Sequence, residues 1–329
     1  MKLIIQIPCF NEAASLPLTL ADLPRAVTGF DGVEWLVIDD GSTDGTSEVA
    51  RSFGVDHVVR LTGNLGLARA FSAGLDAAVA AGADVIVNTD ADNQYNAADI
   101  PLLVAPILAG EAELVVGARP IDSIPHFSPL KKWLQGFGSW VTRVFSGTDV
   151  QDAPSGFRAM SRDAARRLNV FSSYTYTLET IIQAGKNGMA VKSVPIRVNG
   201  ETRPSRLVKS ISSYVKRSVI TMFRIFLVYQ PLRAFLTAGS IIGGLGFLVG
   251  LRFLYYFVIG EGSGHVQSVI LTALLIGSGL LLCVMGLLAD LIAVNRRLLE
   301  QANWRLGELE DVLKEVRRRQ RDTDGGGGE

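Results

Sequence analysis

The chain has 329 residues, of which 48 % are hydrophobic and 19 % are charged, and its formal net charge is zero. A neutral chain gives no reason to expect nucleic acid as a partner. Its two cysteines, Cys9 and Cys283, exclude a disulfide framework and a cysteine metal cluster. The apolar surplus lies after Ala234. The N-terminus carries no signal-peptide pattern, because Pro8 interrupts its short apolar run, so we expect the first domain to stay in the cytoplasm.

Short apolar runs alternate with helical patterns over the first third of the chain. The predicted strands are Leu3–Ile7, Glu34–Asp39, His57–Leu61, Val85–Asp90 and Glu111–Gly117. The predicted helices between them are Ser15–Leu23, Thr46–Phe53, Gly66–Ala81 and Ala98–Leu108. This alternation predicts an α/β domain with a Rossmann-like, mostly parallel sheet that helices cover on both faces. Ligands of such sheets bind beyond the carboxyl ends of the strands.

The sharpest chemical signal follows the fourth predicted strand, where Asp90 and Asp92 flank one small residue. Two carboxylates at a strand end can bind a divalent cation together with the oxygens of a diphosphate. The alternative is a solvated acidic turn. The position of the pair directly after a buried strand favours the metal site.

Two more polar corners end predicted strands. Asp39 and Asp40 can hydrogen-bond a nucleobase and ribose hydroxyls. We also expect Ser42 or Thr43 to cap the next helix, since the cap and the ligand contacts use different atoms. In the segment from Pro8 to Glu12, Phe10 can face a base and Glu12 can hydrogen-bond it. We expect the three corners to meet at one edge of the sheet.

The C-terminal third has a membrane pattern. Basic and large apolar residues mix from Leu207 to Arg233, which is typical of helices in a membrane interface. Ala234–Ile259 and Ser268–Val294 each exceed the ~20 residues that span a bilayer. The loop Gly260–Gln267 has no Lys or Arg, whereas arginines flank the hairpin, so both termini are expected in the cytoplasm. A buried helical hairpin of a soluble protein is the alternative.

An apolar seam with alternating spacings of three and four follows the hairpin. Its members are Leu299, Ala302, Leu306, Leu309, Leu313 and Val316. The seam predicts a coiled-coil-like helix that pairs between subunits or packs on its own domain. We divide the chain into a catalytic domain (1–206), interfacial helices (207–233), a transmembrane hairpin (234–294), a cytoplasmic amphipathic helix (295–321) and a disordered tail (322–329).

Five motifs in this order resemble those of the family 2 inverting glycosyltransferases, which have the GT-A fold. They are Pro8-x-Phe10-Asn11-Glu12, Val37-Ile38-Asp39-Asp40-Gly41-Ser42-x-Asp44-Gly45-Thr46, Asn64-x-Gly66, Asp90-x-Asp92-x-Gln94 and Asp152-x-x-Ser155-Gly156-Phe157-Arg158. Together with the hairpin, they are similar to those of the polyprenyl- and dolichyl-phosphate hexose synthases.

The resemblance implies a role for each matching residue. The nucleoside would bind to Pro8, Phe10, Glu12, Asp39 and Asp40, and Mg²⁺ or Mn²⁺ with the diphosphate to Asp90, Asp92 and Gln94. Arg119 would lie near the diphosphate or the acceptor phosphate, and Asp152 would be a base or an acceptor-site group. The remaining acceptor residues would be Ser155, Arg158, Arg203, Arg206 and Lys209. For the last three, binding to anionic lipid headgroups is the equal alternative.

The implied reaction moves a hexose from a UDP-sugar or GDP-mannose to polyprenyl or dolichyl phosphate at the inner membrane. Because the phosphate is largely ionised at neutral pH, a strong base is less necessary than for a hydroxyl acceptor. Membrane lipids and further copies of the chain, as a dimer or tetramer, are expected partners. A processive polysaccharide synthase would carry more spans and a Q-x-x-R-W motif, which this sequence lacks. A non-catalytic adaptor and a nucleotidyltransferase are weaker alternatives.

Overall fold

The computed structural model describes residues 1–120, 129–170, 176–200, 220, 223–224, 226–260 and 262–325. The chain divides into two compact units, Met1–Ser218 and Val219–Glu329, and each is described by itself. Three residues expected to bind phosphate or lipid headgroups, Arg203, Arg206 and Lys209, lie outside the described residues.

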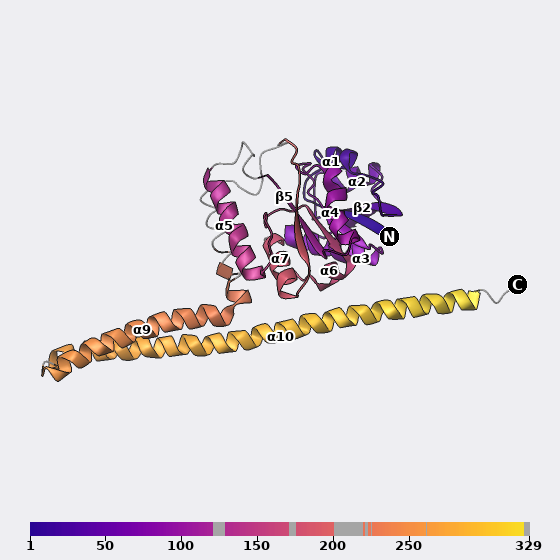
Figure 1. Ribbon diagram of the computed structural model, residues 1–329. Coiled ribbons are helices and arrows are strands. Elements are labelled where there is room, and N and C mark those ends of the chain that lie inside the picture. Colours follow the sequence, from indigo (N-terminus) through magenta and orange to yellow (C-terminus); the bar gives the residue numbers. More distant parts are fainter. Residues whose placement is uncertain are drawn as a thin grey trace. The chain divides into compact units, whose positions relative to one another are not determined.

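A seven-stranded sheet forms the first unit (Figure 1). Its strands are β1 (Lys2–Cys9), β2 (Gly32–Asp39), β3 (His57–Arg60), β4 (Val85–Asn88), β5 (Leu114–Ala118), β6 (Arg158–Ser161) and β7 (Val191–Pro195). The strand order is β3-β2-β1-β4-β6-β5-β7. β6 is antiparallel to both neighbours, and the other pairs are parallel. The prediction of a mostly parallel Rossmann-like sheet is confirmed.

Helices cover both faces of this sheet. Residues of α1 (Leu16–Asp22), α2 (Thr46–Ser52) and α4 (Ile100–Leu108) share one buried cluster with the strands. Residues of α3 (Leu67–Ala80), α6 (Arg162–Arg167) and α7 (Thr177–Lys186) lie in a second cluster. A short 3₁₀ helix, η1 (Ala97–Asp99), precedes α4, and α5 (Pro129–Ser146) packs against α7.

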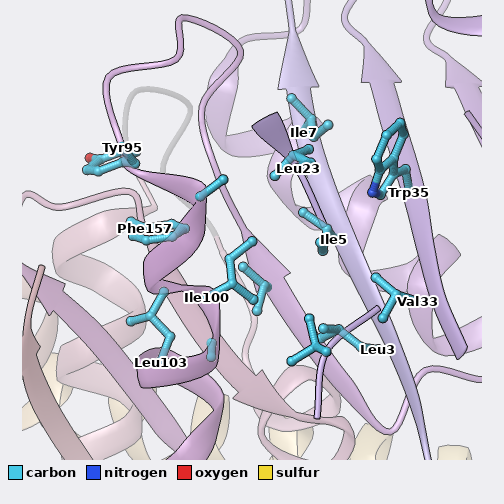
Figure 2. Packing of buried hydrophobic residues seen from close by; sticks show 14 of the residues in the cluster. Leu3, Ile5, Ile7, Leu23, Val33, Trp35, Tyr95, Ile100, Leu103 and Phe157 are labelled. Atoms are coloured by element: carbon cyan, nitrogen blue, oxygen red, sulfur yellow. The ribbon is translucent and has the colours of Figure 1, made fainter. Parts of the chain in front are cut away.

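The side chains of β1 explain why this strand is central. Leu3, Ile5 and Ile7 point into the cluster with Trp35 and Leu23, as Figure 2 shows. Ile4, one residue out of phase, belongs to the opposite cluster. Successive strand residues face opposite sides, so a strand that is apolar at nearly every position must be buried on both.

The second unit contains two long apolar helices that lie side by side, α9 (Pro231–Val258) and the first part of α10 (Val266–Gly325) (Figure 1). A short 3₁₀ helix, η3 (Gly262–His265), joins them. Gly239 and Gly279 lie where the two helices approach each other closely, because a β-carbon on Gly279 would lie 2.7 Å from the Gly239 carbonyl oxygen. Glycine at such contacts is typical of helices that pack within membranes.

Both helices have the length and composition to cross a membrane, over Pro231–Val258 and Val266–Arg296. Aromatic side chains gather at the turn end of the hairpin. The ring of Tyr256 stacks on His265 at a centroid distance of 4.0 Å, and the Arg252 guanidinium lies 5.8 Å from the same ring. Aromatic rings with an arginine at a helix end are characteristic of a membrane interface.

The sequence pattern predicted a separate helix after the second span. In the structure this segment belongs to the same helix as the span. α10 continues without a break for 60 residues and includes residues 322–325, which were predicted to belong to a disordered tail. No proline or helix-ending glycine separates its apolar and charged parts, so nothing in the sequence interrupts the helix. Leu299, Leu306 and Leu309 of the predicted seam are exposed on this helix.

Candidate active site

The loops that follow β1 and β2 are joined by hydrogen bonds. The Asn11 N–H donates to the Ser42 hydroxyl oxygen at 2.9 Å, and the Thr43 N–H donates to Asn11 Oδ1 at 2.9 Å. The Glu12 N–H donates to Thr46 Oγ1 at 2.9 Å. Asn11 has a positive φ of 55°, a conformation that asparagine tolerates better than most residues. The two predicted nucleoside corners therefore form one structural unit.

The carboxylates of Asp39 and Asp40 in this unit each accept two hydrogen bonds. Asp39 accepts hydrogen bonds from the Ser42 N–H at 2.7 Å and from the Ser47 hydroxyl. Burial alone raises the pKa of Asp39, but these bonds outweigh it, so the pKa lies below its usual range. Asp40 accepts from the N–H groups of Leu65 and Gly66 at 2.8 and 2.9 Å.

Asp40 thus holds the Asn64-x-Gly66 motif against the end of β2, which gives that motif a structural role. The prediction that Ser42 or Thr43 caps the next helix is wrong. The residue that precedes α2 is Gly45, at φ 86°, and the Thr46 N–H at the start of the helix donates to Asp44 Oδ1 at 3.1 Å.

Phe10 and Glu12 differ in what they present to a ligand. Phe10 keeps 38 % of its surface exposed although it directly follows a buried strand. Glu12 is buried and receives a hydrogen bond from the Ser15 hydroxyl. Pro8 is buried at the end of β1 and presents no polar side-chain atom.

The two carboxylates of the predicted metal site follow β4. Asp92 Oδ1 accepts a hydrogen bond from the Gln94 N–H at 3.2 Å. Burial and the neighbouring charge of Asp92 raise the pKa of the Asp90 carboxyl to about 7, against the opposing charges of Arg119 and Arg158. A raised pKa beside a second carboxylate is the environment that a bound cation relieves.

The donor set also fits Mg²⁺ or Mn²⁺. These ions prefer oxygen ligands and usually take one or two carboxylates together with phosphate oxygens. Within the part of the chain that the structure describes, no group of three or more His, Cys, Asp or Glu side chains could hold a metal by itself.

A buried polar network that the sequence did not reveal connects β4 with the 152–158 loop. The Asn88 side-chain amide donates to the Gly156 carbonyl at 2.8 Å and to the Tyr176 hydroxyl at 2.9 Å. The Gly156 N–H donates to the Tyr95 hydroxyl at 2.9 Å. The polar residue within the apolar run Val85-Ile86-Val87-Asn88 was the available signal. The network fixes the 152–158 loop beside the end of β4.

Gly156 suits this close approach because there is little room for a side chain at its position. A β-carbon at this position would lie 3.0 Å from both Asp90 Oδ1 and the Tyr176 hydroxyl oxygen. Tyr95 and Phe157, whose rings stack at 5.1 Å and are labelled in Figure 2, support the same region from the core.

Arg119 and Asp152 form a bidentate ion pair. Arg119 Nε lies 2.6 Å from Asp152 Oδ2, and Nη2 lies 3.0 Å from Oδ1. The Arg119 backbone N–H also donates to Oδ2 at 3.3 Å. Only 1 % of the Asp152 side chain is exposed, against 14 % for Arg119. Both Asp152 oxygens are engaged, so the geometry favours a role in holding Arg119 over a role as a base.

Arg158 and Ser155 lie inside the protein. Arg158 has no exposed surface, and its guanidinium donates to the carbonyls of Ser155 and Ala153 and to the Thr180 hydroxyl. Burial lowers its pKa to about 10. Through these contacts Arg158 stabilises the conformation of the 152–158 loop. The Ser155 hydroxyl is also buried and has no hydrogen-bond partner among the described residues.

The site therefore brings three features together at the carboxyl ends of the strands. They are the corner with the partly exposed ring of Phe10, the carboxylates of Asp90 and Asp92, which suit a cation, and the guanidinium of Arg119, which Asp152 holds. The charge of Asp90 contributes to the raised pKa of Arg119, so this carboxylate and the Arg119 guanidinium interact electrostatically. Such an arrangement suits a substrate that carries a diphosphate.

Comparisons with known proteins identify the family of the chain. The glycosyl transferase family 2 model matches residues 4–168. The chain is 31 % identical over 219 residues to an undecaprenyl-phosphate mannosyltransferase of Micrococcus luteus, covering 62 % of this chain and 88 % of the relative. It is 29 % identical over 213 residues to a UDP-N-acetylglucosamine–dolichyl-phosphate N-acetylglucosaminyltransferase of Methanococcus voltae, covering 58 % of this chain and 83 % of the relative.

Among solved structures, the chain resembles glucosyl-3-phosphoglycerate synthase of Mycobacterium tuberculosis in complex with Mn²⁺, UDP-glucose and phosphoglyceric acid. The TM-score is 0.52 at 22 % identity, over 67 % of this chain and 79 % of the other, which shows a shared fold. The fold, the site and the matched family model lead to one conclusion: the chain is a glycosyltransferase and belongs to glycosyl transferase family 2.

Proposed function

We propose that the protein transfers a hexose from a nucleotide diphosphate sugar to a polyprenyl or dolichyl phosphate, with inversion at the anomeric carbon. A phosphate oxygen of the lipid forms the new bond to the anomeric carbon. The bond from that carbon to the diphosphate breaks, and its electron pair leaves with the nucleoside diphosphate. The names of the two relatives described above specify undecaprenyl and dolichyl phosphate, and this similarity supports the acceptor class.

The observation that carries the proposal is the position of Asp90 beside the 152–158 loop, whose Asp152 holds Arg119, in a chain with two apolar helices of membrane-spanning length. Bound Mg²⁺ or Mn²⁺ would supply charge neutralisation for the leaving diphosphate, and Asp90 and Asp92 would hold it. Phe10 would stack on the base, and Arg119, held by Asp152, would face a phosphate group.

A donor panel tests the activity. Purified protein with Mn²⁺ and undecaprenyl phosphate would be given UDP-glucose, UDP-N-acetylglucosamine and GDP-mannose in turn, and release of the nucleoside diphosphate would be followed. We expect release from at least one donor only when the lipid is present. Release that does not depend on the lipid would show hydrolysis and contradict the assigned acceptor.

We also propose that both termini lie in the cytoplasm and that only the turn between α9 and α10 lies outside. The absence of Lys and Arg from residues 260–267 supports this orientation. In a variant without Cys9 and Cys283, a cysteine at Ser263 should react with an impermeant thiol reagent added to intact cells. A cysteine at Asp31, an exposed position in the first unit, should not react. The reverse labelling pattern would overturn the orientation.

A further inference from the structure

Residues 196–199, which we name the strap, leave the end of β7 and lie along the loop that carries Asp92 and Gln94. The Asn199 N–H donates to the Gln94 carbonyl at 2.8 Å, and Val198 forms an isolated antiparallel bridge with Tyr95. The strap is therefore bonded to the backbone of the loop that directly follows the first metal carboxylate.

The side chain of Asn199 adds contacts at the most constrained point of this loop. Its Nδ2 donates to the Asn93 carbonyl at 3.0 Å and to the Tyr95 carbonyl at 3.4 Å. Asn93 has a φ of 56°, in the left-handed region that residues other than glycine enter rarely. Its own side chain donates to Asp22 Oδ2 at 2.8 Å. Asn93, between Asp92 and Gln94, is thus held through its side chain and its carbonyl.

A second contact fixes the far end of the same loop. The Asp99 carboxylate, 1 % exposed, accepts from Arg197 Nε at 2.9 Å, from Arg197 Nη2 at 2.6 Å and from the Arg197 backbone N–H at 2.6 Å. The Arg197 side chain itself is 65 % exposed. The guanidinium thus reaches from the surface to a buried carboxylate at the start of α4, and it anchors the strap there.

We propose that Asn199 is a positioning residue for the metal carboxylates, and this inference rests on the proposed function. Without the Nδ2 donor, the Asn93 and Tyr95 carbonyls lose their bonds to Asn199, and one of the two restraints on the left-handed conformation of Asn93 disappears. The peptide between Asp92 and Gln94 then gains freedom, so Asp92 is no longer fixed relative to Asp90. The nucleoside corner at Phe10 and Asp39 has its own hydrogen bonds and stays in place.

The test separates these two parts of the site by binding. Isothermal titration calorimetry would measure the affinity of the full chain in detergent for UDP and for GDP, once in EDTA and once in Mn²⁺. Asn199→Asp keeps the size of the side chain but replaces the donor with an acceptor. We expect its affinity in EDTA to equal that of the wild type. The gain in affinity from Mn²⁺ should fall about tenfold or more, as for other residues that orient metal ligands.

The matched control is Asn187→Asp, the same substitution at an exposed asparagine after α7, which should keep the whole gain. If Asn199→Asp does not fold, as judged by its thermal transition, Asn199→Ser is measured in its place. An undiminished gain from Mn²⁺ would overturn the proposal, and so would an equal loss in EDTA and in Mn²⁺, which indicates general damage. A wild-type protein whose nucleotide affinity ignores Mn²⁺ would instead refute the metal assignment in the proposed function, and this inference with it.

Discussion

The guanidinium of Arg119 binds both carboxylate oxygens of Asp152, at 2.6 and 3.0 Å, across 33 residues of sequence. The pair joins the end of β5 to the start of the 152–158 loop. In this pair Asp152 cannot turn toward an acceptor without releasing Arg119. We propose that Asp152 orients Arg119 and that Arg119 contacts the substrate.

The first prediction concerns this pair. Arg119→Ala leaves the Asp152 carboxylate buried without its partner, and such a change typically costs about 3–5 kcal/mol of stability. Arg119→Ala combined with Asp152→Ala should cost less than the sum of the single variants, because no unpaired charge remains. Thermal unfolding of the four proteins measures this coupling. Additive losses would contradict the assigned pairing.

The same pair predicts a kinetic result. If Asp152 positions Arg119, Asp152→Asn should lower the transfer rate while the shape of the pH–rate profile stays the same. A general base would behave differently. Its protonation makes the rate fall at low pH, and its removal would take this part of the pH–rate profile away. Arg119→Lys, which retains the charge but not the forked geometry, should be impaired in the same way.

A further prediction follows from the raised pKa of Asp90, about 7. Because the folded-state pKa exceeds that of an unfolded aspartate, the folded protein holds an extra proton between the two values. Without metal, this carboxyl's contribution to stability is therefore lost as the pH rises toward 7. Thermal unfolding in EDTA should show the decline, and Asp92→Asn should reduce it by removing the neighbouring charge.

Protons should also compete with the metal for Asp90. Below a pH of about 7, we expect the apparent Mn²⁺ affinity to fall by about tenfold for each pH unit, since the cation binds the deprotonated carboxylate. Titration of the nucleotide-bound protein with Mn²⁺ at several pH values measures this. An affinity that does not change between pH 6 and pH 8 would count against Asp90 as a ligand.

Several elements could be predicted from local sequence because their signals are local. The apolar runs of β1 and β2 and the acidic residues that follow the strands need no distant partner to be recognised. β6 and β7 were missed. β6 has only four residues and contains Arg158, whose burial depends on the 152–158 loop and α7. The strap was also missed because its role depends on a distant contact. Asn199 contacts Asn93, which lies 106 residues earlier in the sequence.

The hairpin offers a prediction with an internal control. Gly279→Leu would place a side chain where the Gly239 carbonyl oxygen and the Gly243 backbone already lie, so α9 and α10 should separate. Overpacking of this kind typically costs about 1–3 kcal/mol. Gly277→Leu, on the same helix with nothing within 4 Å of its β-carbon position, should be tolerated. Thermal unfolding in detergent compares them, and equal effects would contradict the packing.

Assembly can be tested through the exposed leucines of α10. Leu299, Leu306 and Leu309 lie exposed, and apolar surface in water costs about 25 cal/mol per Å². We predict a dimer or tetramer in which this seam pairs between copies. Native mass spectrometry in detergent should show the oligomer, and Leu306→Glu with Leu309→Glu should weaken it. An active monomer in lipid nanodiscs would contradict the prediction.

The central claim is that the sugar ends on the lipid phosphate. The most direct measurement gives the protein a donor labelled in its sugar, with undecaprenyl phosphate and Mn²⁺. It then compares the label in the organic phase with the nucleoside diphosphate released. We expect equal amounts of both, inverted anomeric configuration in the lipid product, and loss of both in EDTA and in Asp92→Asn. Nucleoside diphosphate release with the label left in the aqueous phase, or full transfer in EDTA, would contradict it.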